Sequence, residues 1–342
     1  MRGPIPVNVI TGALGSGKTT LLARLLRDPG MADTAVLINE FGEAGLDHHL
    51  LQRIDGDTVM LQSGCLCCTI RGDLAASVRD LYGRRQRGEI TPFRRLVVET
   101  TGLADPAPVL YTLMAEDVLR HHFRLGNVIT TVDAVNGARQ LDAFEESLKQ
   151  AAVADRLVLT KTDIADAAAA KMLRARLATL NPAAQIFDGA DAASAAKLFT
   201  SDVYNPRTKG REVANWIAAA AASGGGHAHD VNRHDASIYA FCLTFEAELD
   251  WIAFGVWLTM LLHAHGENVL RVKGILNVAD SETPVAVHGV QHIVHPPVHL
   301  AAWPDDDRRS RIVFIVRGLA QADIEASLAA FNGIGGRGAR AA

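Results

Sequence analysis

The sequence feature that most constrains the fold is the stretch Gly12-Ala13-Leu14-Gly15-Ser16-Gly17-Lys18-Thr19, which matches the phosphate-loop pattern G-x-x-x-x-G-K-[ST]. Glycines in this pattern adopt positive φ angles, so that successive backbone N–H groups point at a bound phosphate. The apolar residues 7–10 before the loop are typical of a buried strand, and leucines at helical spacing follow it over residues 21–26. This context favours a nucleotide-binding loop over a chance glycine-rich turn.

The residues of this loop can be given roles from their chemistry. We expect the ammonium of Lys18 to reach the β- and γ-phosphates of a nucleoside triphosphate, and the hydroxyl of Thr19 to bind Mg²⁺. The helix that begins here adds the positive end of its dipole to the phosphate site. The loop residues expected to bind the nucleotide are Gly12, Gly15, Ser16, Gly17, Lys18, Thr19 and Thr20.

A second signature follows the apolar residues 96–98, where the sequence reads Glu99-Thr100-Thr101-Gly102. An acid at the end of such a strand holds Mg²⁺, and the N–H of the following glycine can sense the γ-phosphate. The acid is a glutamate where many GTPases have aspartate, so we favour a water-mediated role over direct ligation. We predict catalytic roles for Lys18, Thr19 and Glu99, and nucleotide contacts for Glu99 and Gly102.

A third motif, Thr160-Lys161-Thr162-Asp163, follows the expected strand 156–159 and is similar to the guanine-specificity motif Asn-Lys-x-Asp. The Asp163 carboxylate can accept hydrogen bonds from guanine N1–H and the exocyclic amine, while the stem of Lys161 packs on the base. Adenine has an acceptor in place of N1–H, so the motif predicts GTP rather than ATP. Thr160 replaces the usual asparagine, and its hydrogen bond to the phosphate loop is either lost or remade.

Three of the four cysteines lie within Gly64-Cys65-Leu66-Cys67-Cys68. Thiolates suit Zn²⁺, Co²⁺, Ni²⁺ or Cu⁺, and Gly64 permits the sharp turn that would let three of them converge. We favour a metal site at Cys65, Cys67 and Cys68 over redox chemistry or a role as small core residues. The fourth ligand is left open among a carboxylate such as Glu40, a histidine, water or a ligand from a partner.

The composition is that of an ordinary globular protein, with 49% hydrophobic and 21% charged residues. The formal charge of −4 gives no electrostatic reason to expect nucleic acid or a membrane surface as a partner. Residues 1–6 lack the apolar region of a secretory signal, and the longest apolar run, residues 251–262, is too short to span a bilayer. We therefore expect a cytoplasmic location and small-molecule and protein partners.

The chain is long enough for two domains. We expect an α/β phosphate-loop NTPase domain with a mostly parallel sheet over residues 1–222, and a smaller α+β domain over residues 237–332, with an antiparallel sheet and helices on one face. Residues 223–236 are predicted to be a glycine and histidine linker, and residues 333–342 a disordered tail. The expected strands of the second domain are 237–245, 268–278, 284–295 and 310–316, and its helices are 250–265 and 322–331.

As a set, these motifs resemble the CobW-type family of metal-chaperone GTPases, which are related to the nickel GTPases of urease and hydrogenase maturation. The resemblance covers about residues 5–330, and Cys-x-Cys-Cys is its most specific part. It implies that the thiolates bind Zn²⁺ or Co²⁺ near the nucleotide, and that GTP state controls metal release to a client protein. The segments that carry it are residues 12–19, 39–43, 64–68, 99–102 and 160–163, the histidine-bearing linker and Arg271-Val272-Lys273-Gly274.

Our hypothesis from the sequence is a slow GTPase in which Mg²⁺-GTP orders residues 40–43 against the cysteine loop and hydrolysis releases the metal to a client. A water-orienting group is left open among Glu43, Glu99 and the client. One alternative is a zinc-buffering or regulatory protein that uses GTP only as a structural ligand. Another is a kinase or transferase, which would leave the cysteine cluster without a purpose. The physiological metal, the client and homodimer formation are left open.

Overall fold

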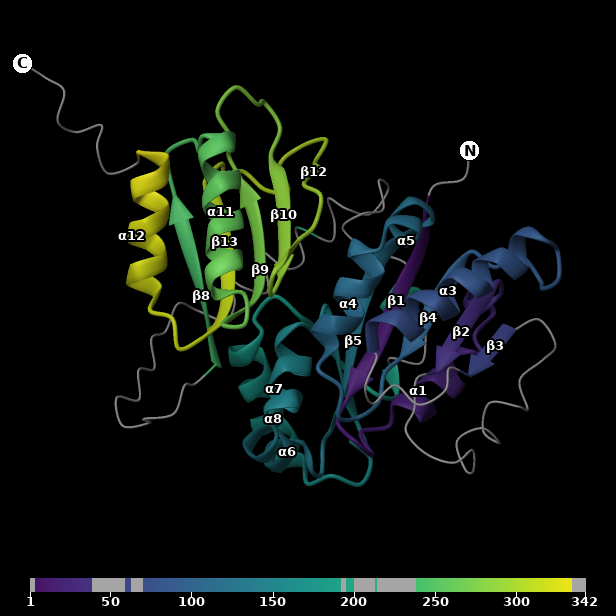
Figure 1. Cartoon of the computed structure of the whole chain (residues 1–342). Helices are drawn as coiled ribbons and strands as arrows, with labels where there is room; N and C mark the ends of the chain where they lie inside the picture. The colour runs from purple at the N-terminus through teal and green to yellow at the C-terminus, as the bar shows by residue number, and fades with distance from the viewer. Residues whose placement is uncertain are drawn as a thin grey trace, which may run out of the picture. The chain divides into compact units, whose positions relative to one another are not determined.

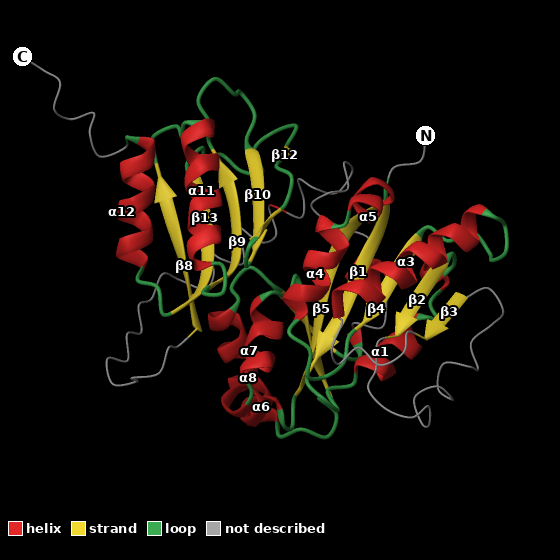
Figure 2. Cartoon of the chain, in the orientation of Figure 1, coloured by secondary structure: helices red, strands yellow, loops and turns green. Residues whose placement is uncertain are grey.

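The computed structural model describes residues 4–38, 59–62, 70–191, 195–199, 213 and 238–333. The chain forms two compact units, and helices and strands can be followed in both (Figures 1 and 2). Glu40, Glu43 and the three clustered cysteines lie outside the described residues, as does the expected linker at 223–236. Among the described residues, no helix has both the length and the apolar character needed to cross a bilayer.

The described part of the first unit is built on a sheet of seven strands that are all parallel, in the order β3-β2-β4-β1-β5-β6-β7 (Figure 1). Since the strands are parallel, their carboxyl ends all lie at one edge of the sheet. β1 is in the middle, between β4 and β5. The strands are β1 Ile5–Gly12, β2 Thr34–Ile38, β3 Val59–Gln62, β4 Arg95–Glu99, β5 Phe123–Asp133, β6 Arg156–Thr160 and β7 Gln185–Asp188.

Helix α1 (Lys18–Leu25) packs its leucines against one face of this sheet. Leu21, Leu22 and Leu25 join a buried cluster with Ile10 of β1 and Val97 of β4. Burial of one leucine side chain contributes about 1.5–3 kcal/mol, so this contact holds α1 firmly against the sheet. The other helices in the described part of the unit are η1 Pro29–Met31, α3 Ile70–Gln86, α4 Pro106–Ala115, α5 Asp117–His122, α6 Gly137–Ala143, α7 Glu145–Ala152, α8 Ala167–Leu180 and α9 Ala195–Phe199.

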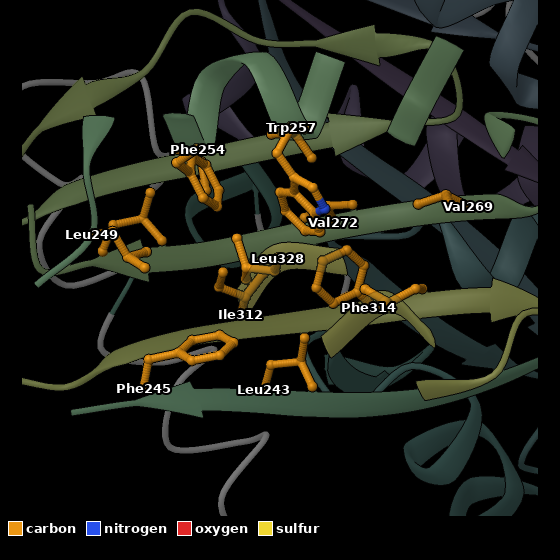
Figure 3. Packing of buried hydrophobic residues seen from close by; sticks show 14 of the residues in the cluster. Leu243, Phe245, Leu249, Phe254, Trp257, Val269, Val272, Ile312, Phe314 and Leu328 are labelled. Carbon is orange, nitrogen blue, oxygen red and sulfur yellow. The ribbon is translucent and has the colours of Figure 1, made fainter. Parts of the chain in front are cut away.

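The described part of the second unit has a six-stranded antiparallel sheet in the order β11-β10-β9-β13-β8, with β12 also paired to β10. Phe254 and Trp257 of α11 and Leu328 of α12 form a buried core with strand residues that include Phe314 (Figure 3). Both helices therefore cover the same face of the sheet, as expected. The elements are β8 Ile238–Phe245, α11 Trp251–His265, β9 Val269–Leu276, β10 Val285–Val290, β11 Ile293–Val294, β12 Val298–His299, β13 Ser310–Arg317 and α12 Gln321–Asn332.

The fold class is confirmed, but one expected strand is wrong. Residues 284–295 are not one strand: β10 turns at Gln291 and His292 and pairs back with β11, so that Val290 lies opposite Ile293. Gln291 reverses the chain with a φ of +49°. The apolar pattern hides this turn because valine and isoleucine flank it on both sides, and neither turn residue is a typical turn former.

Candidate functional site

The phosphate loop lies between β1 and α1, as the sequence predicts. Gly12, Gly15 and Gly17 have φ angles of +141°, +73° and +89°, which glycine adopts without strain. A Cβ atom at Gly12 would lie 2.4 Å from the carbonyl oxygen of Thr131 on β5. Glycine is therefore required there by close packing as well as by backbone angle.

The side chains of Lys18 and Ser16 in the loop are both held by hydrogen bonds. Lys18 Nζ donates to the carbonyls of Gly12 and Ala13, at 3.1 Å each. The hydroxyl of Ser16 is hydrogen-bonded to that of Thr131 at 2.6 Å. The lysine ammonium is thus already positioned across the loop, where the phosphates of a nucleotide would bind.

Thr19 and Glu99 meet at the end of β4. Thr19 Oγ1 donates to Glu99 Oε1 at 2.6 Å, and Glu99 is only 2% exposed. A hydroxyl and a carboxylate are the hard oxygen donors that Mg²⁺ prefers, so this pair fits the expected magnesium site chemically. Gly102 lies beside the phosphate loop as well, because a Cβ there would be 2.5 Å from the backbone nitrogen of Leu14.

The side chain of Thr160 makes the hydrogen bond to the phosphate loop that the sequence alone did not decide. Its Oγ1 donates to the carbonyl oxygen of Ser16 at 2.7 Å, so threonine remakes a hydrogen bond to the phosphate loop. Thr160 also packs on the loop, since a Cβ at Gly17 would lie 3.4 Å from its methyl group. The end of β6 is therefore joined directly to the phosphate site.

Lys161 and Asp163 follow in the turn after β6. The backbone of Lys161 is left-handed, with a φ of +57°, and Asp163 is exposed. The Lys161 ammonium makes an ion pair with Asp133 Oδ2 at 2.7 Å. Asp163 is therefore an exposed carboxylate two residues after a lysine whose ammonium is paired to Asp133.

The sequence prediction missed Asp133, the last residue of β5. Its Oδ1 accepts from the backbone N–H groups of Val135 and Asn136, and its Oδ2 from the Asn136 amide and Lys161. Burial alone would raise the pKa of Asp133, but these hydrogen bonds outweigh it and lower the pKa. The available signal was that β5, like β4, is an apolar strand that ends in an acid.

Gln150 of α7 is a second residue that the prediction missed. It is fully buried, and its Nε2 donates to the carbonyls of Gly102 and Ala104 at 3.3 and 3.0 Å. The neighbouring Lys149 forms an ion pair with Asp105 at 3.2 Å. Helix α7 therefore holds the loop that follows β4.

The expected nucleotide residues all lie in the described chain, whereas the expected transition-metal ligands do not. Within the described residues, no group of three or more His, Cys, Asp or Glu side chains could hold a metal ion. His288 and His295 are buried close together, with ring centroids 6.2 Å apart. The proposed ligands outside the described residues are Glu40, Cys65, Cys67 and Cys68.

The parallel sheet has a phosphate loop after its central strand and an acid at the end of the adjacent strand. These two features define the class of P-loop nucleotide hydrolases. Residues 6–188 match the family model "CobW/HypB/UreG, nucleotide-binding domain". Residues 238–332 match "Cobalamin synthesis protein cobW C-terminal domain". The chain belongs to the CobW/HypB/UreG family, which confirms the resemblance seen in the sequence.

Two related proteins and one crystal structure are similar to this chain over nearly its whole length. The zinc chaperone YjiA of Escherichia coli is 30% identical, over 95% of this chain and 98% of its own. The zinc-regulated GTPase metalloprotein activator 1 of Schizosaccharomyces pombe is 28% identical, over 92% of this chain and 83% of its own. The crystal structure of Zn(II)-bound YjiA GTPase matches with a TM-score of 0.67 at 27% identity, covering 96% of this chain and 99% of that one. This chain is accordingly a GTPase.

Proposed function

We propose that this chain is a metallochaperone, which binds a transition metal ion at Cys65, Cys67 and Cys68 and delivers it to a client protein under the control of bound GTP. The carboxylate of Glu40 completes the proposed site. Zinc is the metal proposed first, and cobalt is a second candidate because it also accepts thiolate ligands. The observation that carries the proposal is the register of the strands that lead to these residues.

Three neighbouring strands end level with one another at the edge of the sheet. Ile38 of β2 pairs with Gln62 of β3 on one side and with Glu99 of β4 on the other. Glu40 follows Ile38 by two residues, and Cys65 follows Gln62 by three. Since neighbouring strands are about 4.7–4.9 Å apart and each residue spans at most about 3.3–3.6 Å, both segments begin within short reach of Glu99. This supports a metal site next to the γ-phosphate.

The named relatives support zinc. YjiA is named a zinc chaperone, and its crystal structure is described as Zn(II)-bound. A second crystal structure is of a Zn(II)-bound YjiA triple mutant with one glutamate and two cysteines changed to alanine, the same residue types as in the site proposed here. Because that mutant still binds zinc, total metal content is a weak test of the site, whereas metal affinity is a sharper one.

Hydrolysis in the proposed site depends on positioning and charge neutralisation rather than covalent chemistry. Mg²⁺, held by Thr19 and through water by Glu99, would neutralise charge on the phosphate oxygens. Lys18 would exchange its two carbonyl partners for the β- and γ-phosphates, while the N–H of Gly102 holds the γ-phosphate. The attacking water would be oriented by Glu43, Glu99 or the client.

The base end of the proposed site selects GTP. Asp163 would accept hydrogen bonds from guanine N1–H and the exocyclic amine, and the stem of Lys161 would cover the face of the base. ATP would leave the Asp163 carboxylate facing an acceptor on adenine, which costs binding energy.

The coupling is tested by titrating Zn²⁺ in competition with a chromophoric chelator, in the presence of GTPγS, GDP or no nucleotide. We expect the highest affinity with GTPγS, and loss of that nucleotide-dependent affinity in the triple variant Cys65→Ser/Cys67→Ser/Cys68→Ser. Cys242→Ser is the matched control, because Cys242 is a free cysteine on β8. Equal affinities in the three nucleotide states would refute nucleotide control.

Turnover distinguishes the metallochaperone from its rivals. Phosphate release from GTP with metal and a candidate client present supports the GTP-hydrolysing metallochaperone. Negligible release even with both present would favour a zinc-buffering or regulatory protein that uses GTP only as a structural ligand.

A further inference from the structure

The carboxylate at the end of β5 has no role in the proposed hydrolysis, yet it is the acceptor in four hydrogen bonds. Three of them come from the turn that follows, from Val135 and Asn136. The fourth comes from Lys161, 28 residues further along the chain. The Asp133 side chain is 2% exposed, whereas that of Lys161 is 37% exposed. The buried Asp133 carboxylate therefore binds the ammonium of Lys161, whose side chain is partly exposed.

The sheet register brings these two residues together. Asp133 on β5 pairs with Thr160 on β6, and this is the last pair between the two strands. Lys161 is the residue that follows Thr160, so its backbone lies one residue beyond this pair. The Lys161 backbone is also fixed, because its carbonyl accepts from the N–H groups of Ile164 and Ala165 at 3.3 and 3.1 Å. Lys161 is therefore held at both its backbone and its ammonium, which leaves its four-carbon stem one preferred path between them.

We propose that Asp133 is a positioning residue for guanine recognition: it holds the Lys161 ammonium so that the lysine stem is ordered before the base arrives. This inference rests on the proposed assignment of Lys161 and Asp163 to the base. A free lysine would lose rotamer freedom on binding, and fixing it in advance removes that cost from the binding free energy. The benefit falls on the base and not on the phosphates, which are bound by residues 12–19.

The decisive variant is Asp133→Asn, which keeps an oxygen for the backbone N–H groups of Val135 and Asn136 but removes the negative charge that faces Lys161. We expect its affinity for GDP, measured by calorimetry, to fall roughly three- to tenfold, the equivalent of ordering one long side chain. Its affinity for inorganic tripolyphosphate, which has no base, should stay the same. Asn136→Ala is the matched control, because it removes one donor to the same carboxylate and leaves the ion pair.

A double-mutant cycle separates positioning from a structural role. In a Lys161→Met background, Asp133→Asn should have no further effect on GDP affinity, because the side chain it positions is gone. An equal loss in both backgrounds, or an equal loss for GDP and tripolyphosphate, would overturn the inference. If Asp133→Asn does not fold, Asp133→Glu, which shifts the carboxylate by one methylene, takes its place in the cycle.

The same data show whether the base site itself is assigned correctly. If Lys161→Met and Asp163→Asn both leave GDP affinity unchanged, the proposed guanine site is wrong and the role of Asp133 falls with it. If these two variants weaken GDP binding and Asp133→Asn does not, only the positioning role is wrong.

Discussion

Replacing Thr160 with valine removes the hydrogen bond that joins the end of β6 to the phosphate loop, with almost no change in side-chain shape. The bond is 2.7 Å long, and Thr160 is 9% exposed. Removing the Thr160 hydroxyl leaves the buried Ser16 carbonyl without this donor, and such a loss costs about 1–3 kcal/mol. We expect the free energy of unfolding to fall by this amount, and Tm by roughly 2–4 °C for each kcal/mol in a unit of this size.

The assay is chemical denaturation of the nucleotide-free protein, followed by calorimetric titration with GDP. Affinity for GDP should fall too, because the Ser16 carbonyl belongs to the loop that binds the phosphates. Thr162→Val is the matched control: it makes the same chemical change two residues away, in a half-buried side chain. If both variants lose the same free energy, or Thr160→Val loses none, the Thr160 hydrogen bond does not stabilise the loop.

Three further predictions concern the last residue of β4, the loop that follows it and the second unit. Glu99→Gln should lower kcat for GTP roughly 10–100-fold, the range for groups that orient metal ligands; unchanged phosphate release at saturating Mg²⁺ would contradict its role beside Thr19. Gln150→Leu removes the donor to two loop carbonyls and should lower the free energy of unfolding by about 1–3 kcal/mol, which thermal unfolding would detect. Hydrogen bonds from Arg309 lower the pKa of Asp307 to about 2 from 3.8, so this carboxylate stabilises the fold above pH 3.8 and that contribution is lost as the pH falls toward 2. We therefore expect Asp307→Asn to lose less unfolding free energy than the unsubstituted protein between pH 5 and pH 2. The difference should be at most about 1 kcal/mol, because the ion pair is partly exposed. An identical pH dependence of the two proteins would show that the pair adds no stability.

The phosphate loop could be predicted from the sequence because each residue in its pattern has a fixed backbone or ligand role. Gly12 and Lys18 allow few other arrangements, so their positions follow from residue type alone. The antiparallel second sheet followed from alternating apolar residues. The turn at Gln291 did not, because apolar residues continue on both sides of it and its own residues are poor turn formers.

The contacts that the sequence did not predict depend on register between strands. Asp133 and Lys161 meet only because β5 and β6 pair with Asp133 opposite Thr160. Gln150 meets the loop after β4 because α7 packs beside it. No periodicity in one segment carries this information, since each contact depends on how two distant segments are aligned.

The level ends of β3, β2 and β4 have an electrostatic consequence. Two strand spacings separate the end of β3 from that of β4, or about 10 Å. At that distance two unit charges interact by roughly 1–2 kcal/mol at an effective dielectric constant of about 20. The γ-phosphate charge that Mg²⁺ leaves unneutralised would therefore favour a cation at the proposed thiolate site even without any movement of the chain. Because about 10 Å is also the Debye length at 0.1 M salt, added salt would weaken this part of the coupling and leave a loop rearrangement unaffected.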